Sequence, residues 1–309
     1  MGDTPKPLDT RRGLRSWLRR HDQAVFAYIF MTPILLHLLI FVAFPLIYSM
    51  WLSLQDATGF VGQEKFIGLA NYRTLVASTE FWRVVGQTAY FVVGSVPVRL
   101  VLGLSIALLL DQKIRGRTFY RLLFFSPYVT SLVAVSVIWV WIFDPTWGLL
   151  DYALSLVKLP QLQWLASPAE AMPAIIIVAV WKSVGFTMLI YLAGLQGVPT
   201  HYYEAAKVDG ANALARFRSI TWPLLLPTTF FLLVTEIIGS SQVFDVVFVM
   251  TGGGPIQATR VIVFYLYQYA FQFFKLGFAS AVAWVLFVFI MIITLTQWFL
   301  FPGRDQTVD

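Results

Sequence analysis

Cysteine is absent from this sequence of 309 residues, which excludes a disulfide framework, a thiolate metal site and a cysteine nucleophile. Charged residues are also scarce, at 12% of the chain, whereas 58% of the residues are hydrophobic. A soluble domain carries about 25% charged and about 45–50% apolar residues. The composition therefore excludes an ordinary soluble domain and indicates an all-α integral membrane protein.

Six apolar runs are long enough to cross a bilayer, whose hydrocarbon core of roughly 30 Å needs about 20 residues as a helix. These runs are 24–54, 84–110, 122–143, 171–197, 221–250 and 278–301. We expect six transmembrane helices in one domain at 24–301, with a basic tail at 1–23 and a short tail at 302–309. The first run is too long for a signal peptide, so it should remain as an uncleaved anchor.

A further apolar segment, 261–274, has many aromatic residues but is short for a transmembrane helix. Its tyrosines suit the membrane–water interface, where a ring can be half hydrated. We therefore predict a helix at the membrane surface. If this segment crossed the bilayer instead, the C-terminus would change sides.

Lysine and arginine are distributed unequally over the predicted connections. Fourteen lie in the two tails and in the second and fourth connections, whereas six lie on the opposite side. By the positive-inside rule, both termini and the fourth connection, 199–220, are cytoplasmic. The net charge of +6 is then mainly a topology signal, which argues against nucleic-acid binding.

The fourth connection has the turn chemistry of two short helices. Pro199 suits a first helical turn, and Asp209-Gly210 should end that helix because glycine tolerates the left-handed conformation. Asn212 can cap a second helix covering about 213–220. Such a segment either docks a cytoplasmic partner or merely connects two spans, and its composition leaves both readings open.

The loop contains Glu204-Ala205-Ala206, Asp209-Gly210-Ala211, Phe217, Ile220 and Leu226-Pro227. Other motifs occur in order at Gly68-Leu69-Ala70-Asn71-Tyr72, at Met250-Thr251-Gly252-Gly253-Gly254-Pro255 and at Gly277-Phe278-Ala279-Ser280-Ala281. This succession, over about 26–301, resembles the permease subunits of binding-protein-dependent ABC importers. Their coupling loop reads E-A-A-x-x-x-G, followed by I-x-x-P. The flanking motifs resemble the sugar-importer branch, and the segment before Pro255 resembles the first permease of an unequal pair.

The resemblance implies the fold of an ABC type I importer permease, whose loop fits a cleft of a cytoplasmic ATPase subunit. Glu204 would pair with a basic group of that subunit, and Gly210 would supply the turn. The candidate coupling residues are Tyr203, Glu204, Ala205, Ala206, Asp209, Gly210, Ala211 and Phe217. ATP and Mg²⁺ would bind to the partner, in keeping with the lack of a G-x-x-x-x-G-K-[ST] motif here. No catalytic residue, bound cofactor or metal site is expected in this chain.

Ionisable residues inside predicted spans are costly and usually face a cavity or a partner. Glu236 lies near the middle of its span and Ser240 follows one turn later, which suits a hydroxyl-rich solute. The substrate-pathway candidates are Glu236, Ser240, Gln242, Asp245 and Arg99. The alternative is a structural ion pair of Glu236 with Arg99 or with Lys182. We predict that Glu236→Ala abolishes uptake and leaves the assembled complex intact, whereas loss of assembly would indicate the ion pair.

His37 has no second ligand at metal spacing, so we expect it to pack between helices through a hydrogen bond.

We therefore predict a membrane subunit of an ATP-driven importer for a di- or oligosaccharide, or for glycerol phosphate, in a bacterial-type cytoplasmic membrane. Its expected partners are a second, homologous permease, an ATPase dimer, an extracytoplasmic solute-binding protein and membrane lipid. The alternative is an ion-coupled secondary transporter, which would use Glu236 and Asp245 but leaves the cytoplasmic loop without a purpose. A membrane enzyme lacks any nucleophile–base or metal-spaced set in this sequence.

Overall fold

The computed structural model describes residues 22–59, 64–112 and 114–300, with side chains from residue 26 onward. The predicted tails, apart from Asp22 and Gln23, and the last residue of the sixth predicted span, Phe301, lie outside these residues.

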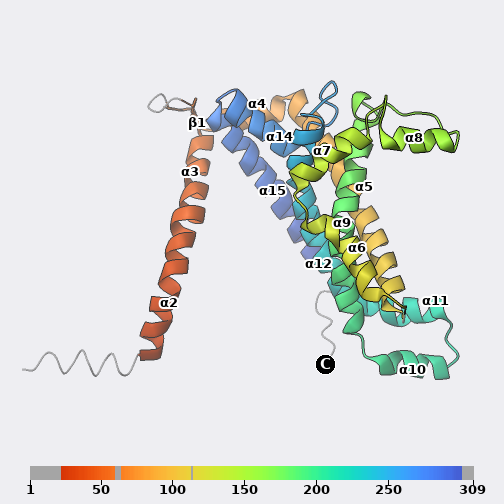
Figure 1. Cartoon of the computed structure of the whole chain (residues 1–309). Helices are drawn as coiled ribbons and strands as arrows, with labels where there is room; N and C mark the ends of the chain where they lie inside the picture. The colour runs from red at the N-terminus through yellow and green to blue at the C-terminus, as the bar shows by residue number, and fades with distance from the viewer. Residues whose placement is uncertain (1–21, 60–63, 113, 301–309) are drawn as a thin grey trace, which may run out of the picture.

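The described chain is almost entirely helical (Figure 1). Its α-helices are α2 (Asp22–Leu38), α3 (Phe44–Ser53), α4 (Ala70–Ala77), α5 (Thr79–Asp111), α6 (Arg117–Val129), α7 (Leu132–Ile142), α8 (Leu149–Leu156), α9 (Ala171–Gln196), α10 (Thr200–Val208), α11 (Ala213–Arg216), α12 (Trp222–Ser241), α13 (Asp245–Met250), α14 (Ile262–Tyr267) and α15 (Leu276–Leu300). Shorter helical turns are η1 (Leu39–Ala43), η2 (Trp164–Ala166), η3 (Phe217–Thr221) and η4 (Gln268–Gln272). Strands β1 (Gln55–Asp56) and β2 (Lys65–Phe66) pair antiparallel.

The membrane fold is confirmed, but the third span differs from the prediction. Five helical segments are long and apolar enough to cross a bilayer, and a sixth is a pair of helices, α6 and α7, bent by 97°. The sequence predicted one continuous helix at 122–143. Pro127 lies inside α6, and the chain is extended at Thr130 and Ser131, so the helix stops after Val129 and a new helix starts at Leu132.

The fifth span also differs from a continuous helix at 221–250. It extends further toward the N-terminus, through α11 and η3, and it is interrupted between Ser241 and Asp245. Phe244, in this interruption, has neither helical nor extended backbone angles.

The centre of the bundle is formed by α5, α9 and α12. Backbones approach closely there, since a Cβ added to Gly103 of α5 would lie 2.7 Å from Thr187 Cγ2 of α9. Met188 and Tyr191 of α9 pack with Leu225 and Leu232 of α12 in one buried cluster. These three helices carry most of the polar residues described below.

The Gly68–Tyr72 motif joins the first span to the end of the molecule that carries α4 and α14 (Figure 1). Asn71 Nδ2 donates to Ser53 O at 2.9 Å and to Gln55 O at 2.8 Å, and Tyr72 Oη lies 2.7 Å from Ser53 Oγ. Gly68 has φ +58°, a conformation that glycine adopts at little cost. The motif therefore closes the turn between α3 and α4.

The segment predicted as a surface helix is α14 with η4. It lies at the same end of the molecule as α4 (Figure 1) and is not among the possible spans. Phe264 and Tyr265 are buried rather than half hydrated, because α14 packs against α5 and α15.

The first span stands apart from the bundle (Figure 1). None of its most apolar stretch is buried, and it contacts the other spans through α3 and α15. His37 is exposed, with its ring centroid 5.0 Å from that of Phe41 in the same helix. The expected hydrogen-bonded packing of His37 against another helix is therefore wrong within the described chain.

Candidate coupling loop and translocation cavity

The turn after α10 has the hydrogen bonds of a Schellman motif. Ala211 N donates to Ala206 O at 2.8 Å, and Gly210 N donates to Lys207 O at 3.1 Å. Gly210 has φ +77° and an added Cβ would meet nothing within 4 Å. Backbone conformation rather than crowding thus explains the glycine.

The second helix of the loop continues into the fifth span. Asn212 caps it as predicted, because its Oδ1 accepts from Ala215 N at 2.8 Å. The separate helix expected at 213–220 is wrong, since α11, η3 and α12 follow one another without a break. Pro223 occupies the first turn of α12, and a π-type turn directly before a proline accommodates its missing N–H.

The loop extends from the end of the molecule opposite α4 (Figure 1). Glu204 and Ala205 are exposed. Two apolar residues that the sequence analysis did not single out are strongly exposed beside the turn: Val208 at 88% and Leu214 at 73%. The sequence signal that could have identified them is their position, two residues before and four residues after the turn glycine.

One side-chain contact attaches α10 to the base of the fifth span. Tyr203 Oη lies 3.0 Å from Thr221 Oγ1, whose residue is buried. Arg216 Nη1 donates to Ala211 O at 2.7 Å, which braces the turn itself. The half-buried Phe217 has its ring 6.4 Å from that of Trp222.

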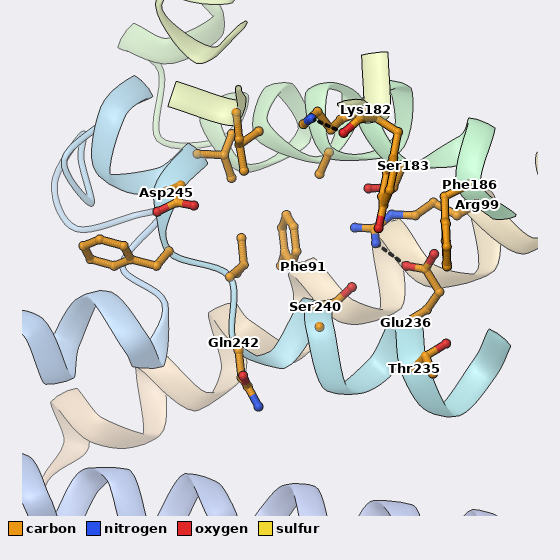
Figure 2. A pocket seen from close by; sticks show the side chains of 17 residues that line it. Phe91, Arg99, Lys182, Ser183, Phe186, Thr235, Glu236, Ser240, Gln242 and Asp245 are labelled. Carbon is orange, nitrogen blue, oxygen red and sulfur yellow. Dashed lines mark hydrogen bonds and ion pairs between the residues drawn. The ribbon is translucent and has the colours of Figure 1, made fainter. Parts of the chain in front are cut away.

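A cavity of about 600 Å³ lies between α5, α9, α12 and the bend of the third span (Figure 2). All five residues predicted for the substrate pathway line it. The lining residues are Phe91, Arg99, Tyr128, Leu132, Ala179, Lys182, Ser183, Phe186, Thr235, Glu236, Gly239, Ser240, Gln242, Val243, Phe244, Asp245 and Val246. In Figure 2 the Gln242 side chain extends away from the others.

Glu236 and Arg99 form a buried ion pair. Arg99 Nη1 donates to Glu236 Oε2 at 2.5 Å, and Thr187 Oγ1 donates to Glu236 Oε1 at 2.9 Å. Arg99 and Glu236 are only 6% and 7% exposed. Both oxygens of the carboxylate are therefore bound within the chain, so the ion pair with Arg99 forms, whereas the role of Glu236 in the substrate pathway stays a prediction.

Two buried polar atoms beside this pair are unpaired. Arg99 Nε and Ser240 Oγ have no hydrogen-bond partner among the described residues. An unpaired buried donor costs about 1–3 kcal/mol.

Lys182 is bound differently from Arg99. Its Nζ donates to the carbonyl oxygens of Pro127, Tyr128 and Thr130 at 2.8, 2.8 and 2.6 Å. All three ammonium donors are used, so Lys182 offers none to a solute.

Aromatic rings also line the cavity, and the sequence alone could not tell which aromatic residues would do so. Tyr128 and Phe186 are stacked at 4.9 Å between centroids and 17° between planes, and Phe91 and Phe244 lie at other parts of the wall. Among the described residues there is no cluster of three or more histidine or acidic side chains able to hold a metal ion.

Comparison with known proteins agrees with these features. The family model described as "Binding-protein-dependent transport system inner membrane component" matches residues 99–303. The trehalose/maltose transport system permease protein MalF of Thermococcus litoralis is 34% identical over 92% of this chain and 96% of its own length. The probable starch degradation products transport system permease protein AmyD of Thermoanaerobacterium thermosulfurigenes is 32% identical over 91% and 95%.

Among solved structures, one chain of a bacterial alginate ABC transporter, in complex with an alginate pentasaccharide-bound periplasmic protein, has the same fold. Its TM-score is 0.83 at 23% identity, covering 94% of this chain and 99% of that chain. The chain therefore belongs to the inner-membrane components of binding-protein-dependent transport systems and is a permease subunit of an ABC importer.

Proposed function

We propose that this permease forms half of the pathway by which a di- or oligosaccharide enters the cell. The observation that carries the proposal is the 600 Å³ cavity between spans, lined by polar groups and by aromatic faces. Hydroxyl groups pair with such donors and acceptors, and aromatic rings pack on the apolar faces of a sugar ring. Two relatives are named for the transport of trehalose/maltose and of starch degradation products, which supports a carbohydrate.

This chain supplies one coupling loop and one half of the proposed pathway, so further subunits must complete the importer. A homologous second permease completes the membrane unit, an ATPase dimer binds ATP and Mg²⁺ in the cytoplasm, and an extracytoplasmic binding protein delivers the solute. Both termini and residues 199–220 face the cytoplasm, as the distribution of basic residues indicates.

The loop has the features of a mechanical joint to the ATPase. Glu204 offers one exposed charge, whereas Val208 and Leu214 offer apolar surface on either side of Gly210. ATP would draw the two ATPases together, and the loops would follow them, so that the spans open to the outside. The opening is an equilibrium between a state closed to the outside and a state open to it. ATP and the loaded binding protein can shift this equilibrium only because each binds one state more tightly than the other.

Reconstitution tests this proposal. The complete complex in proteoliposomes should take up maltose or trehalose only with ATP on the ATPase side. Glu204→Arg and Gly210→Trp should each lose the ATPase on purification. Matched controls are Glu64→Arg and Gly68→Trp on the opposite side, since Gly68 also has positive φ and open space around it. Uptake driven by an ion gradient without ATP would contradict the coupling role.

A further inference from the structure

The bend between α6 and α7 leaves backbone groups without helical partners. The last carbonyl oxygens of a helix have none within it, and α6 ends at Val129, well inside the length of a span. Pro127 removes a further N–H, although Ser126 Oγ donates to Leu123 O at 3.2 Å and Thr130 Oγ1 to Pro127 O at 2.6 Å. In a bilayer such carbonyl groups must be satisfied by the protein.

Lys182 of α9 closes this end of α6. Its ammonium binds three of the carbonyl oxygens at the bend, those of Pro127, Tyr128 and Thr130. A cation at a helix C-terminus also opposes the partial negative charge of the helix dipole. Lys182 is 9% exposed, and no carboxylate lies within ion-pair distance of it among the described residues. The bend is thus its binding partner.

The same face of α9 fixes α6 at short range. A Cβ added to Gly185, one turn after Lys182, would lie 2.0 Å from Phe124 O. Phe186, four residues after Lys182, stacks on Tyr128 at 4.9 Å. The distance and the register of α6 against α9 are thus set by three residues of α9: Lys182, Gly185 and Phe186.

The bend forms part of the cavity wall. Tyr128, on the last turn of α6, and Leu132, at the start of α7, both line the cavity. Beyond the bend, α7 packs against α13, where Val135 shares a buried cluster with Val246 and Val247. Opening or closing the bend would therefore move Tyr128 and Leu132 relative to Asp245, the first residue of α13.

We propose that Lys182 is a positioning residue for transport: by binding the carbonyl end of α6 it holds the α6–α7 bend, and so places Tyr128 and Leu132 as the movable wall of the cavity. This role rests on the proposed passage of solute through that cavity. Lys182 acts through the helix and not on the solute, because its three donors are all occupied.

Electron paramagnetic resonance can measure the bend in the assembled complex. The chain has no cysteine, so Leu123→Cys on α6 and Ile138→Cys on α7, both exposed at 53% and 54%, place two spin labels with cysteine-free partner subunits. Lys182→Met, which keeps the length of the side chain without its donors, should broaden the distance distribution and shift it. Lys182→Arg, which can still donate to the carbonyl groups, should keep the narrow distribution.

The rate of uptake should change together with the distance across the bend. We expect Lys182→Met to lower the maximal rate of maltose or trehalose uptake roughly tenfold, as the loss of three hydrogen bonds to carbonyl groups at the bend implies. Lys158→Met, at an exposed lysine of the outer connection, should leave both the distances and the rate unchanged. If Lys182→Met fails to assemble, Gly185→Ala replaces it, because its Cβ would push α6 away from α9 and disturb the same bonds.

An unchanged distance distribution in Lys182→Met and Gly185→Ala overturns the proposal. A shifted distribution with a normal uptake rate also overturns it, since the wall would then have no role in transport. If the unmodified complex takes up neither sugar, the proposed solute class fails, whereas the distance measurement still decides whether Lys182 holds the bend.

Discussion

Arg99 of α5 and Glu236 of α12 meet at 2.5 Å in the wall of the cavity, and Thr187 of α9 holds the other carboxylate oxygen. One carboxylate thus joins three spans that are far apart in sequence. A buried pair contributes little net stability against apolar residues of the same size, but removing one partner leaves an uncompensated charge. The pair is therefore a structural link between spans, and in the proposed function it is also a polar element of the pathway.

This double role predicts different outcomes for single and double variants. Glu236→Ala leaves Arg99 buried and unpaired, which should destabilise the subunit by about 3–5 kcal/mol. The yield of assembled complex should therefore fall, in contrast to the intact complex expected from the sequence alone. Arg99→Leu combined with Glu236→Leu removes both charges, so assembly should return while uptake stays low. Size-exclusion chromatography of the complex and uptake in proteoliposomes measure the two effects separately.

The control for this experiment is Glu80→Ala with the same measurements. Glu80 forms an ion pair with Arg260 at the outer end of α5, outside the cavity, and its side chain is 37% exposed. Its loss should be tolerated better, because Arg260, although buried, keeps the hydrogen bond that its Nε donates to Gln268 Oε1 at 2.6 Å. Normal uptake by the Arg99/Glu236 double variant would remove the pair from the pathway and leave only its structural role.

The exposed apolar residues of the coupling loop lead to a second prediction. Val208→Asp and Leu214→Asp should weaken binding of the ATPase without unfolding the permease, because neither side chain is buried in this chain. Burial of one such side chain at an interface contributes about 1.5–3 kcal/mol, so the affinity should fall roughly tenfold or more. Co-purification and ATP hydrolysis stimulated by the binding protein measure this loss.

Val157→Asp is the matched control for the loop variants, since Val157 is 65% exposed in the outer connection after α8. It should leave the ATPase bound. If Val208→Asp and Leu214→Asp purify with a full complement of ATPase, the apolar surface is not part of the joint.

Local patterns predicted the turn at Gly210 and the helix cap at Asn212 correctly. Asn212 caps its helix and Gly210 takes the left-handed conformation, because both depend on a few neighbouring residues and on backbone sterics. The continuity of α11 with α12 was not predicted, because a proline usually marks a break in a helix. In this chain Pro223 instead follows a π-type turn, and the helix continues. Packing against the rest of the bundle decides between those outcomes, and packing is not local.

The cavity could be predicted only as a set of separate residues. Arg99, Glu236 and Ser240 were identified from the cost of polar groups in a bilayer. Their arrangement depends on the register between α5, α9 and α12, as does the binding of the bend by Lys182 from 52 or more residues away. The sharp turn between α6 and α7 was missed because the run at 122–143 has no charge and reads as one helix.

The Asn71 contacts predict a stabilising role at the outer end. Asn71→Leu would remove both hydrogen bonds to the backbone of Ser53 and Gln55 and leave their carbonyl groups unpaired, at about 1–3 kcal/mol each. The first span should then detach more readily from α4 and α15. Faster hydrogen exchange at residues 50–57 measures this loosening, whereas unchanged exchange would show that α15 alone holds the first span.

The contact between Tyr203 and Thr221 predicts where motion of the loop enters the membrane. Their hydroxyl groups, 3.0 Å apart, join α10 to the buried base of the fifth span, and that span carries Glu236 further along. Tyr203→Phe keeps the ring and removes one hydrogen bond of about 1 kcal/mol. The ATPase should still bind, because the exposed face of α10 is intact, but more ATP should be hydrolysed for each sugar transported, roughly fivefold by that free energy. Tyr202→Phe, at the exposed neighbouring residue, is the control and should leave the ratio unchanged. An equal ratio for both variants would show that α10 moves the fifth span through the continuous helix α11–η3–α12 alone.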